Sequence, residues 1–152
     1  MDAPFVPIPR VIILDIVKNL NLNNDSVLYD LGCGDGRVLR GVVNSNPNIR
    51  AVGIEKAFVP YLLARFHTRK NKNTQIRRED IFTTNTSDAT VVFFYLFPGI
   101  PDKLMDILEK KCKPGVRVVS CDFECKNRKP TEVIDLNNPN SKRGKKLFVY
   151  KI

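Results

Sequence analysis

The chain lacks the features that would place it in a membrane, at a metal or in an oxidising compartment. No apolar run approaches the roughly 18 residues of a membrane-spanning helix, and no charged-then-apolar leader of the signal-peptide kind is present. The four cysteines (Cys33, Cys112, Cys121 and Cys125) form no Cys-x-x-Cys pair, and His67 is the single histidine. These absences predict a soluble, cytoplasmic protein with reduced, mostly buried thiols, no disulfide framework and no metal site.

Acidic residues are also scarce, at 16 against 25 lysines and arginines, which gives a formal net charge of +9. The basic residues gather in five segments, at 65–72, 77–78, 110–113, 126–129 and 142–146. A field of this sign attracts nucleic acid or acidic protein surfaces. It can equally serve only to keep a small protein soluble. The charge therefore leaves a nucleic-acid partner open without requiring one.

The order of apolar segments predicts an α/β fold. A chain of 152 residues has the length of one domain, so residues 1–152 are interpreted as a single domain without repeats or linkers. Strands are expected at 27–28, 51–55, 75–77, 90–95, 116–120, 132–136 and 147–151, and helices at 10–20, from 38, 59–69 and 101–111. Strands that alternate with helices in this way predict a Rossmann-like, doubly wound, mostly parallel sheet.

Two of the expected helices carry apolar residues at helical spacing, which predicts faces packed against the sheet. In helix 10–20 the expected inward residues are Val11 and Leu14, accompanied by Ile13, Val17 and Leu20. In helix 59–69 they are Leu62, Leu63 and Phe66. His67, among arginines and a lysine on the same helix, is expected at the surface.

The most informative stretch is the loop Tyr29–Arg37, which contains Gly32, Gly34 and Gly36 between an expected strand and an expected helix. Glycines there let the backbone turn tightly and approach a ligand, at the carboxyl end of a parallel sheet. A dinucleotide fingerprint has Gly-x-Gly-x-x-Gly and space for a pyrophosphate. Here the acids Asp30 and Asp35 would face those phosphates, so a cationic ligand without phosphate fits better. The loop therefore predicts a site for S-adenosyl-L-methionine.

A second acid supports this prediction. The segment 51–54 is expected to be a strand, and Glu55 ends it about 20 residues past the glycines. Rossmann-like sites place an acid at this point to accept hydrogen bonds from the ribose hydroxyls. The alternative is a solvated acid at a strand end.

The whole chain resembles the class I, seven-stranded S-adenosylmethionine-dependent methyltransferases, and more closely the small archaeal protein-lysine methyltransferases and their mitochondrial lysine methyltransferase relatives. The residues that carry the resemblance are 5–9, 29–37, 52–55, 89–92, 108–111, 113–115, 117–120 and Phe123. It implies N-methylation of lysine side chains of proteins with broad specificity, and an N-terminal segment, 1–9, that lies over the cofactor through Phe5 and Pro7. It also implies that Asp80 accepts a hydrogen bond from the adenine amino group, beside Ile81 as an apolar floor. Asp80 could instead be a loop or helix-capping residue. Lys56 departs from the family, but its aliphatic stem could cover the ring.

The acceptor end of the predicted site follows the fourth strand, at Phe94-Tyr95-Leu96-Phe97. A lysine must be neutral to attack a methyl group, and at pH 7 this costs about 4–5 kcal/mol from a free pKa of ~10.4. An aromatic wall lowers that cost by removing water from the charged form. Tyr95 and Leu96 are therefore the candidate catalytic residues, with Tyr95 orienting the amine. The alternative for Tyr95 is a core tyrosine at a strand end.

Two other functions remain as alternatives. An RNA or DNA methyltransferase would suit the positive charge, but the Asp/Asn-Pro-Pro-aromatic motif of enzymes that methylate base amines is replaced by Tyr95-Leu96-Phe97-Pro98. Cytosine C5 chemistry needs a nucleophilic cysteine, and none stands in that loop. A non-catalytic S-adenosylmethionine-binding module would keep the fold, although the intact set of Asp30, Gly32, Gly34 and Glu55 argues for cofactor binding. The protein is expected to act as a monomer.

Overall fold

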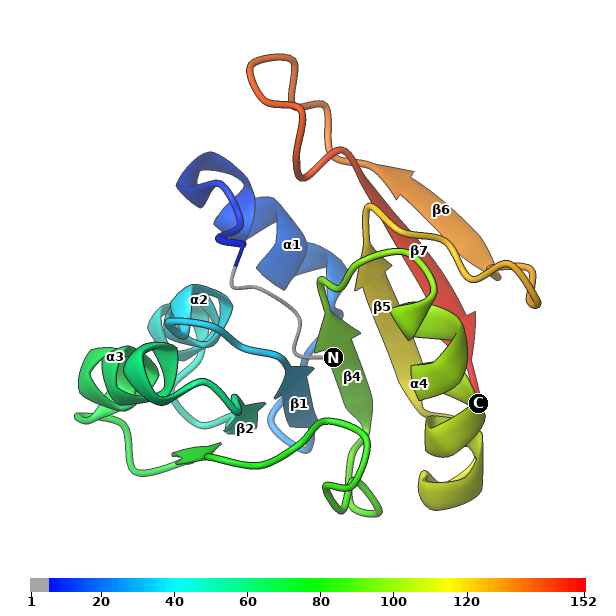
Figure 1. Cartoon of the computed structure of the whole chain (residues 1–152). Helices are drawn as coiled ribbons and strands as arrows, with labels where there is room; N and C mark the ends of the chain where they lie inside the picture. Colours follow the sequence, from blue (N-terminus) through cyan, green and yellow to red (C-terminus); the bar gives the residue numbers. More distant parts are fainter. Residues whose placement is uncertain (1–5) are drawn as a thin grey trace.

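The computed structural model describes residues 6–152, and its seven strands form a single mixed sheet (Figure 1). The strands are β1 (Val27–Leu31), β2 (Arg50–Ile54), β3 (Thr74–Arg77), β4 (Val91–Phe94), β5 (Arg117–Cys121), β6 (Glu132–Asp135) and β7 (Lys146–Lys151). Their order across the sheet is β3-β2-β1-β4-β5-β7-β6. The first five are parallel, and β7 is antiparallel to both β5 and β6. The predicted Rossmann-like, mostly parallel sheet is confirmed.

Helices cover both faces of this sheet, as the doubly wound prediction requires. They are the 3-10 helix η1 (Arg10–Ile12), α1 (Ile13–Asn19), α2 (Arg37–Ser45), α3 (Phe58–Thr68) and α4 (Ile100–Lys111). Side chains of η1, α1 and α2 share one core with residues such as Leu28 and Phe93, whereas α4 shares the other with residues such as Tyr29 and Phe94. Neighbours along a strand enter opposite cores because strand side chains alternate between the two faces.

The predicted inward face of the first helix is only partly right. Ile13, Val17 and Leu20 are buried, but Val11 and Leu14 are 75% and 70% exposed. The helical segment begins with the 3-10 turn η1 and continues as α1, and its buried residues include Ile12 and Ile16 as well. Both stripes are apolar at helical spacing, so the sequence pattern could not distinguish the inner one.

The predicted inward face of α3 is wrong. Leu62, Leu63 and Phe66 are all exposed, and the buried residues of this helix are Ala64 and Thr68. The helix approaches the glycine loop so closely that a Cβ placed on Gly36 would lie 3.1 Å from Ala64. Only small side chains fit at this contact, so the large apolar residues point away from it.

The parallel strands place the site-forming loops at one edge of the sheet. From β1 the chain proceeds to β2 on one side, while β4 lies on the other side of β1. A crevice forms at such a switch point, outside the carboxyl ends of the strands. Within residues 6–152, no helix combines the length and apolar character needed to cross a membrane.

Candidate functional site

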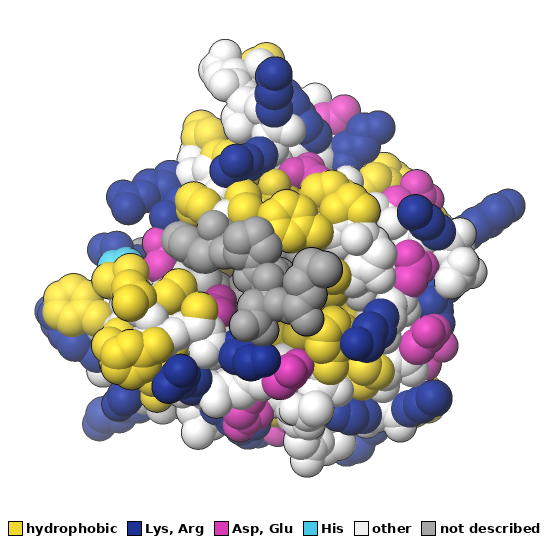
Figure 2. Space-filling model, in the orientation of Figure 1, with side chains coloured by type: hydrophobic (Ala, Val, Ile, Leu, Met, Phe, Trp, Pro, Cys, Tyr) yellow, Lys and Arg dark blue, Asp and Glu magenta, His cyan; other side chains and the backbone are white. Residues whose placement is uncertain are grey.

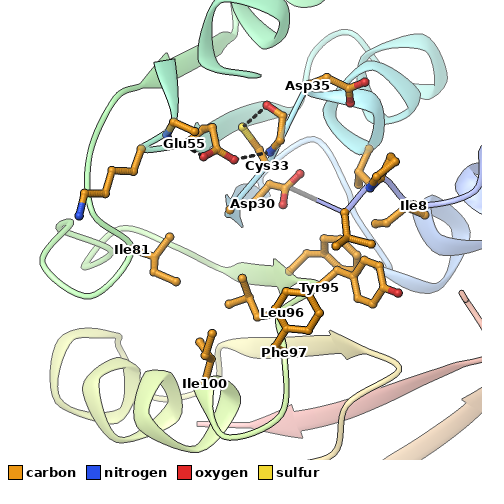
Figure 3. A pocket seen from close by; sticks show the side chains of 18 of the residues that line it. Ile8, Asp30, Cys33, Asp35, Glu55, Ile81, Tyr95, Leu96, Phe97 and Ile100 are labelled. Carbon is orange, nitrogen blue, oxygen red and sulfur yellow. Dashed lines mark hydrogen bonds between the residues drawn. The ribbon is translucent and has the colours of Figure 1, made fainter. Parts of the chain in front are cut away.

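A cavity of about 380 Å³ lies at the carboxyl ends of β1, β2 and β4 (Figure 3). Eleven predicted site residues line it: Pro7, Asp30, Gly32, Gly34, Asp35, Glu55, Lys56, Asp80, Ile81, Tyr95 and Leu96. The twelfth, Phe5, lies outside the described residues. The structure thus brings together side chains that stand as far apart as residues 7 and 96 in the sequence.

The glycine loop is shaped by backbone conformations that other residues rarely adopt. Gly32 has φ +78°, and a Cβ at this position would lie 3.1 Å from the Leu96 side chain. The amide groups of Gly32 and Cys33 both donate to the carbonyl oxygen of Ile54, at 2.8 and 2.9 Å. The loop is therefore fixed to the end of β2, and its glycines expose backbone to the cavity.

Glu55 connects the glycine loop to the start of α3. One carboxylate oxygen accepts a hydrogen bond from the Gly34 amide at 2.9 Å, and the other accepts one from the Ala57 amide at 3.0 Å. Figure 3 shows the Glu55 side chain directed toward the loop. Each carboxylate oxygen can accept more than one hydrogen bond, so Glu55 keeps acceptor capacity on the side of the cavity.

Asp30 is the most deeply buried acid of the site, with 3% of its surface exposed. Burial, reinforced by the carboxylates of Glu55 and Asp35, raises the pKa of Asp30 to about 8. An acid in this position carries its negative charge at a cost, and a cation in the cavity would reduce that cost. The electrostatics of the crevice therefore favour a cationic ligand.

Asp35 differs from Asp30 because its charge is balanced within the protein. The Arg37 guanidinium binds both carboxylate oxygens of Asp35, at 2.7 and 3.1 Å. Burial acts to raise the pKa of Asp35, but the hydrogen bonds and charge of Arg37 outweigh it and hold this pKa below its ordinary value. The third Arg37 contact is a 2.8 Å hydrogen bond to the Ile8 carbonyl oxygen, which attaches the N-terminal segment to the glycine loop.

His67, on α3, contacts the backbone of the glycine loop. Its Nδ1 lies 2.8 Å from the carbonyl oxygen of Asp35, and the side chain is partly buried. The expected surface position is therefore only half right.

Lys56, Asp80 and Ile81 lie together at one end of the cavity. The ammonium group of Lys56 is 3.8 Å from an Asp80 carboxylate oxygen. The other Asp80 oxygen accepts a hydrogen bond from the Phe82 amide at 2.8 Å, so Asp80 also stabilises its own turn. Both interpretations of Asp80 are compatible with this geometry. In Figure 3, Ile81 lies on the opposite side of Leu96 from Tyr95.

Aromatic side chains form the other end of the cavity. The rings of Tyr95 and Phe123 are stacked, with centroids 6.0 Å apart and planes at 15°, and the ring of Phe97 lies 6.4 Å from that of Phe123. Burial, followed by the negative charge of Asp122, raises the pKa of Tyr95 to about 12. Tyr95 is thus a neutral phenol at physiological pH. Phe94 does not belong to this wall, because it is fully buried in the core beside α4.

Several lining residues were not predicted as site residues. They include Cys33, Arg37, Phe58, Arg78, Ile100 and Phe123. Phe123 had a detectable signal, since an aromatic residue directly after the fifth strand reaches the same sheet edge as Tyr95. Arg37 had none, because its role depends on a contact with the carbonyl oxygen of Ile8.

The thiols provide no nucleophile at this site. All four cysteines are free and buried, and burial raises the pKa of each thiol above its ordinary value. Cys33 alone among them lines the cavity. A thiol with a raised pKa stays protonated and unreactive at neutral pH. In the described part of the chain, no group of three histidine, cysteine or acidic side chains is arranged to hold a metal ion.

Comparisons with known proteins identify the family of the chain. Residues 30–132 match the family model described as the ANTKMT methyltransferase domain. A protein-lysine N-methyltransferase from Saccharolobus islandicus (strain REY15A) is 34% identical over 150 residues, which cover 97% of this chain and 93% of that protein. A solved structure of an RNA methyltransferase from Salinibacter ruber, in complex with S-adenosyl-L-homocysteine, is 31% identical. It has a TM-score of 0.87 and covers 97% of this chain and 94% of that chain. The B. subtilis tRNA methyltransferase TrmK, at 16% identity, TM-score 0.72 and coverage of 97% and 67%, shares the fold.

Proposed function

The chain belongs to the ANTKMT methyltransferase domain family of S-adenosylmethionine-dependent methyltransferases, and on that premise we propose that it methylates lysine side chains of proteins. The observation that carries the proposal is the stacked pair of Tyr95 and Phe123 beside the cofactor crevice. Enzymes that methylate an exocyclic base amine typically carry an acid or amide, two prolines and an aromatic residue at this point of the fold. The aromatic pair instead provides a surface along which the aliphatic stem of a lysine can lie.

The cavity residues fit S-adenosylmethionine, which when bound supplies a methyl group activated on a sulfonium. In this proposal Asp30 stabilises the positive charge of the cofactor, and Glu55 accepts hydrogen bonds from its ribose. The backbone of Gly32 and Gly34 follows the ligand closely, and Asp35 holds Arg37 in place beside the N-terminal segment.

The remaining cofactor contacts are assigned to the two ends of the crevice. Asp80 accepts a hydrogen bond from the adenine amino group, Ile81 packs against the ring, and the stem of Lys56 covers it. Pro7, which lines the cavity, covers the cofactor from the N-terminal side. A proline-stiffened segment loses less entropy when it closes than a flexible one does.

Tyr95 and Leu96 prepare the acceptor. Leu96 is buried between the two ends of the crevice and excludes water there. Tyr95 cannot act as a base at neutral pH, because its pKa of about 12 keeps the phenol protonated. Its oxygen can still accept a hydrogen bond from a neutral amine and so direct the nitrogen lone pair. The lysine therefore loses its proton to solvent before it reacts. Alignment of the amine with the methyl group can lower the activation free energy by roughly 7–11 kcal/mol.

A second candidate function is methylation of RNA. It is favoured by one specific observation, the 31% identical relative from Salinibacter ruber, whose name is RNA methyltransferase. The net charge of +9 is compatible with such a substrate. Against it stand the missing Asp/Asn-Pro-Pro motif and, for cytosine C5, the absence of a reactive thiol at the described part of the site.

One experiment separates the two candidates. The purified protein is incubated with methyl-labelled S-adenosylmethionine and cell extract, and the product is divided between protease and nuclease digestion. We expect protease-sensitive label that is recovered as methyl-lysine. Label confined to nuclease-sensitive material would replace the lysine proposal with the RNA candidate.

The assembly and location of the enzyme complete the proposal. We propose a cytoplasmic monomer, and four free, buried cysteines support the cytoplasmic location. Sedimentation of the purified protein and fractionation of cells test the two statements separately.

A further inference from the structure

The surface of α3 carries an apolar face that the cofactor crevice does not explain. Its large apolar side chains are 42% to 64% exposed, and we refer to them together as the α3 apolar face: Phe58, Val59, Leu62, Leu63 and Phe66. Figure 2 shows hydrophobic side chains gathered over the position of α3, at the left of the view. A surface helix normally turns such residues toward the core. A contiguous exposed patch of this kind marks an interaction site.

The charge of this surface has one sign. The helix contains no acidic residue between Phe58 and Thr68. The Arg69 guanidinium lies 3.9 Å from the centre of the Phe66 ring, and that of Arg78 lies 5.1 Å from the centre of the Phe58 ring. Cations held against aromatic rings form a mixed surface that complements apolar and acidic groups on a partner.

The α3 apolar face continues into the rim of the crevice. Phe58 and Arg78 belong both to this surface and to the lining of the cavity. A macromolecule that inserts one side chain into the cavity must cover the neighbouring surface. The face is therefore placed where the remainder of a macromolecular substrate would lie.

We propose that the α3 apolar face docks the protein substrate and selects segments in which apolar and acidic side chains accompany the acceptor lysine. This inference rests on the proposed lysine methylation. A second copy of the chain does not fit the face, because a two-fold contact between identical helices without acids would bring Arg65 and Arg69 close to like charges. Nucleic acid does not fit it either, because the guanidinium groups of Arg69 and Arg78 already lie against the rings of Phe66 and Phe58. The rest of the face, Val59, Leu62 and Leu63, is aliphatic and offers no ring on which a base could stack.

The test uses synthetic peptides that each contain a single lysine. One series carries a Leu-Glu-Phe-Glu block at increasing separations from the lysine, and the matched series carries Ser-Gln-Ser-Gln at the same positions. We expect the wild-type protein to methylate the Leu-Glu-Phe-Glu series with a kcat/KM roughly tenfold higher at the separation that spans α3 and the cavity, mainly through a lower KM.

Two variants and one control assign this preference to α3. Val59→Asp adds an acid to the apolar face, and Arg65→Glu reverses a charge beside it. Val133→Asp is the control, because Val133 is a similarly exposed valine on β6. The two α3 variants should lose the preference while they methylate the Ser-Gln-Ser-Gln series as the wild type does, and the control should keep it. Melting curves of all three confirm folding.

The outcomes separate this inference from the function on which it rests. If no peptide is methylated on lysine by the wild type, the proposed function fails. If both series are methylated equally, or if the preference survives in the α3 variants, the docking inference fails and the function stands. A change in oligomeric state or in binding to anionic vesicles, with an unchanged peptide preference, would assign the α3 apolar face to another partner and also overturn the inference.

Discussion

The side chain of Arg37 donates a hydrogen bond to the carbonyl oxygen of Ile8 at 2.8 Å while its other nitrogen atoms hold Asp35. One residue thus ties the N-terminal segment to the loop that borders the crevice. The carboxylate of Asp35 is not free to balance a ligand charge, because Arg37 already balances it. Asp80, the other acid paired with a cation, lies 3.8 Å from the Lys56 ammonium group. Among the described lining residues, Asp30 and Glu55 are therefore the acids available to a cationic cofactor.

The first prediction follows from this contact. Arg37→Ala removes the connection to Ile8 and leaves the Asp35 carboxylate without its partner. Without this contact the segment that carries Pro7 is no longer attached to the glycine loop. We therefore expect the dissociation constant of S-adenosylmethionine to rise about tenfold, which corresponds to about 1.4 kcal/mol. Isothermal titration calorimetry measures it. Arg40→Ala, an exposed arginine on the same helix, should leave the affinity unchanged.

The second prediction concerns Glu55. Glu55→Ala removes the proposed ribose acceptor and also leaves the amides of Gly34 and Ala57 without their carboxylate partner. We expect a loss of about 1–3 kcal/mol in cofactor binding and a lower melting temperature. Glu132→Ala, on the outer strand β6, serves as the control. Wild-type cofactor affinity in the Glu55 variant would remove Glu55 from the proposed site.

The third prediction uses the pKa of Asp30. Since the folded-state pKa of about 8 lies above the ordinary value of 3.8, the folded protein binds a proton that the unfolded chain has released. The contribution of Asp30 to stability therefore falls as pH rises from about 4 to about 8. Without cofactor, the melting temperature of Asp30→Asn should rise relative to that of the wild type as pH increases from 6 to 8, because only the wild type loses the contribution of Asp30. If the melting temperatures of the two proteins change with pH in parallel, the raised pKa of Asp30 is contradicted.

The same group predicts a proton release on binding. A cation beside Asp30 lowers its pKa, so S-adenosylmethionine binding at pH 7 should release up to about 0.9 proton, the fraction protonated for a pKa near 8. Titrations in buffers of different ionisation enthalpy measure this release. Asp30→Asn should release none, and an equal release from both proteins would assign the proton to another group.

The sequence predicted the fold and most of the crevice because both depend on local patterns. Glycines at fixed spacing, an acid at a strand end and a wholly apolar central strand each indicate a position relative to the sheet. Asp30, Gly32, Glu55 and Tyr95 reach the same cavity because the carboxyl ends of parallel strands share one edge. Their roles in binding remain proposals.

The errors have a common physical origin in contacts between distant segments. Leu62 and Phe66 have the spacing of a buried face, yet the close approach of Ala64 to Gly36 turns them outward. Phe93 and Phe94 are adjacent and equally apolar, so their composition does not distinguish them. Because side chains alternate between the two faces of β4, Phe93 lines the crevice and Phe94 packs in the core on the opposite face. Periodicity identifies a face, but the neighbouring elements decide where it points.

The last prediction concerns the methyl acceptor and separates lysine from a nucleic-acid base. A lysine amine must be neutral to attack, so with saturating cofactor kcat/KM for a lysine peptide should climb about tenfold per pH unit from pH 7 toward 9. Saturation removes the ionisation of Asp30 from this profile, and Tyr95, with a pKa of about 12, does not titrate in the range. A base nitrogen is already neutral at pH 7 and gives no such climb.

Tyr95→Phe keeps the stacking on Phe123 but loses the hydroxyl, so the slope of kcat/KM against pH should persist while the rate falls. Tyr95→Ala should lower the rate further. A flat profile for the wild type would show that amine ionisation does not limit the reaction and would count against lysine as the acceptor.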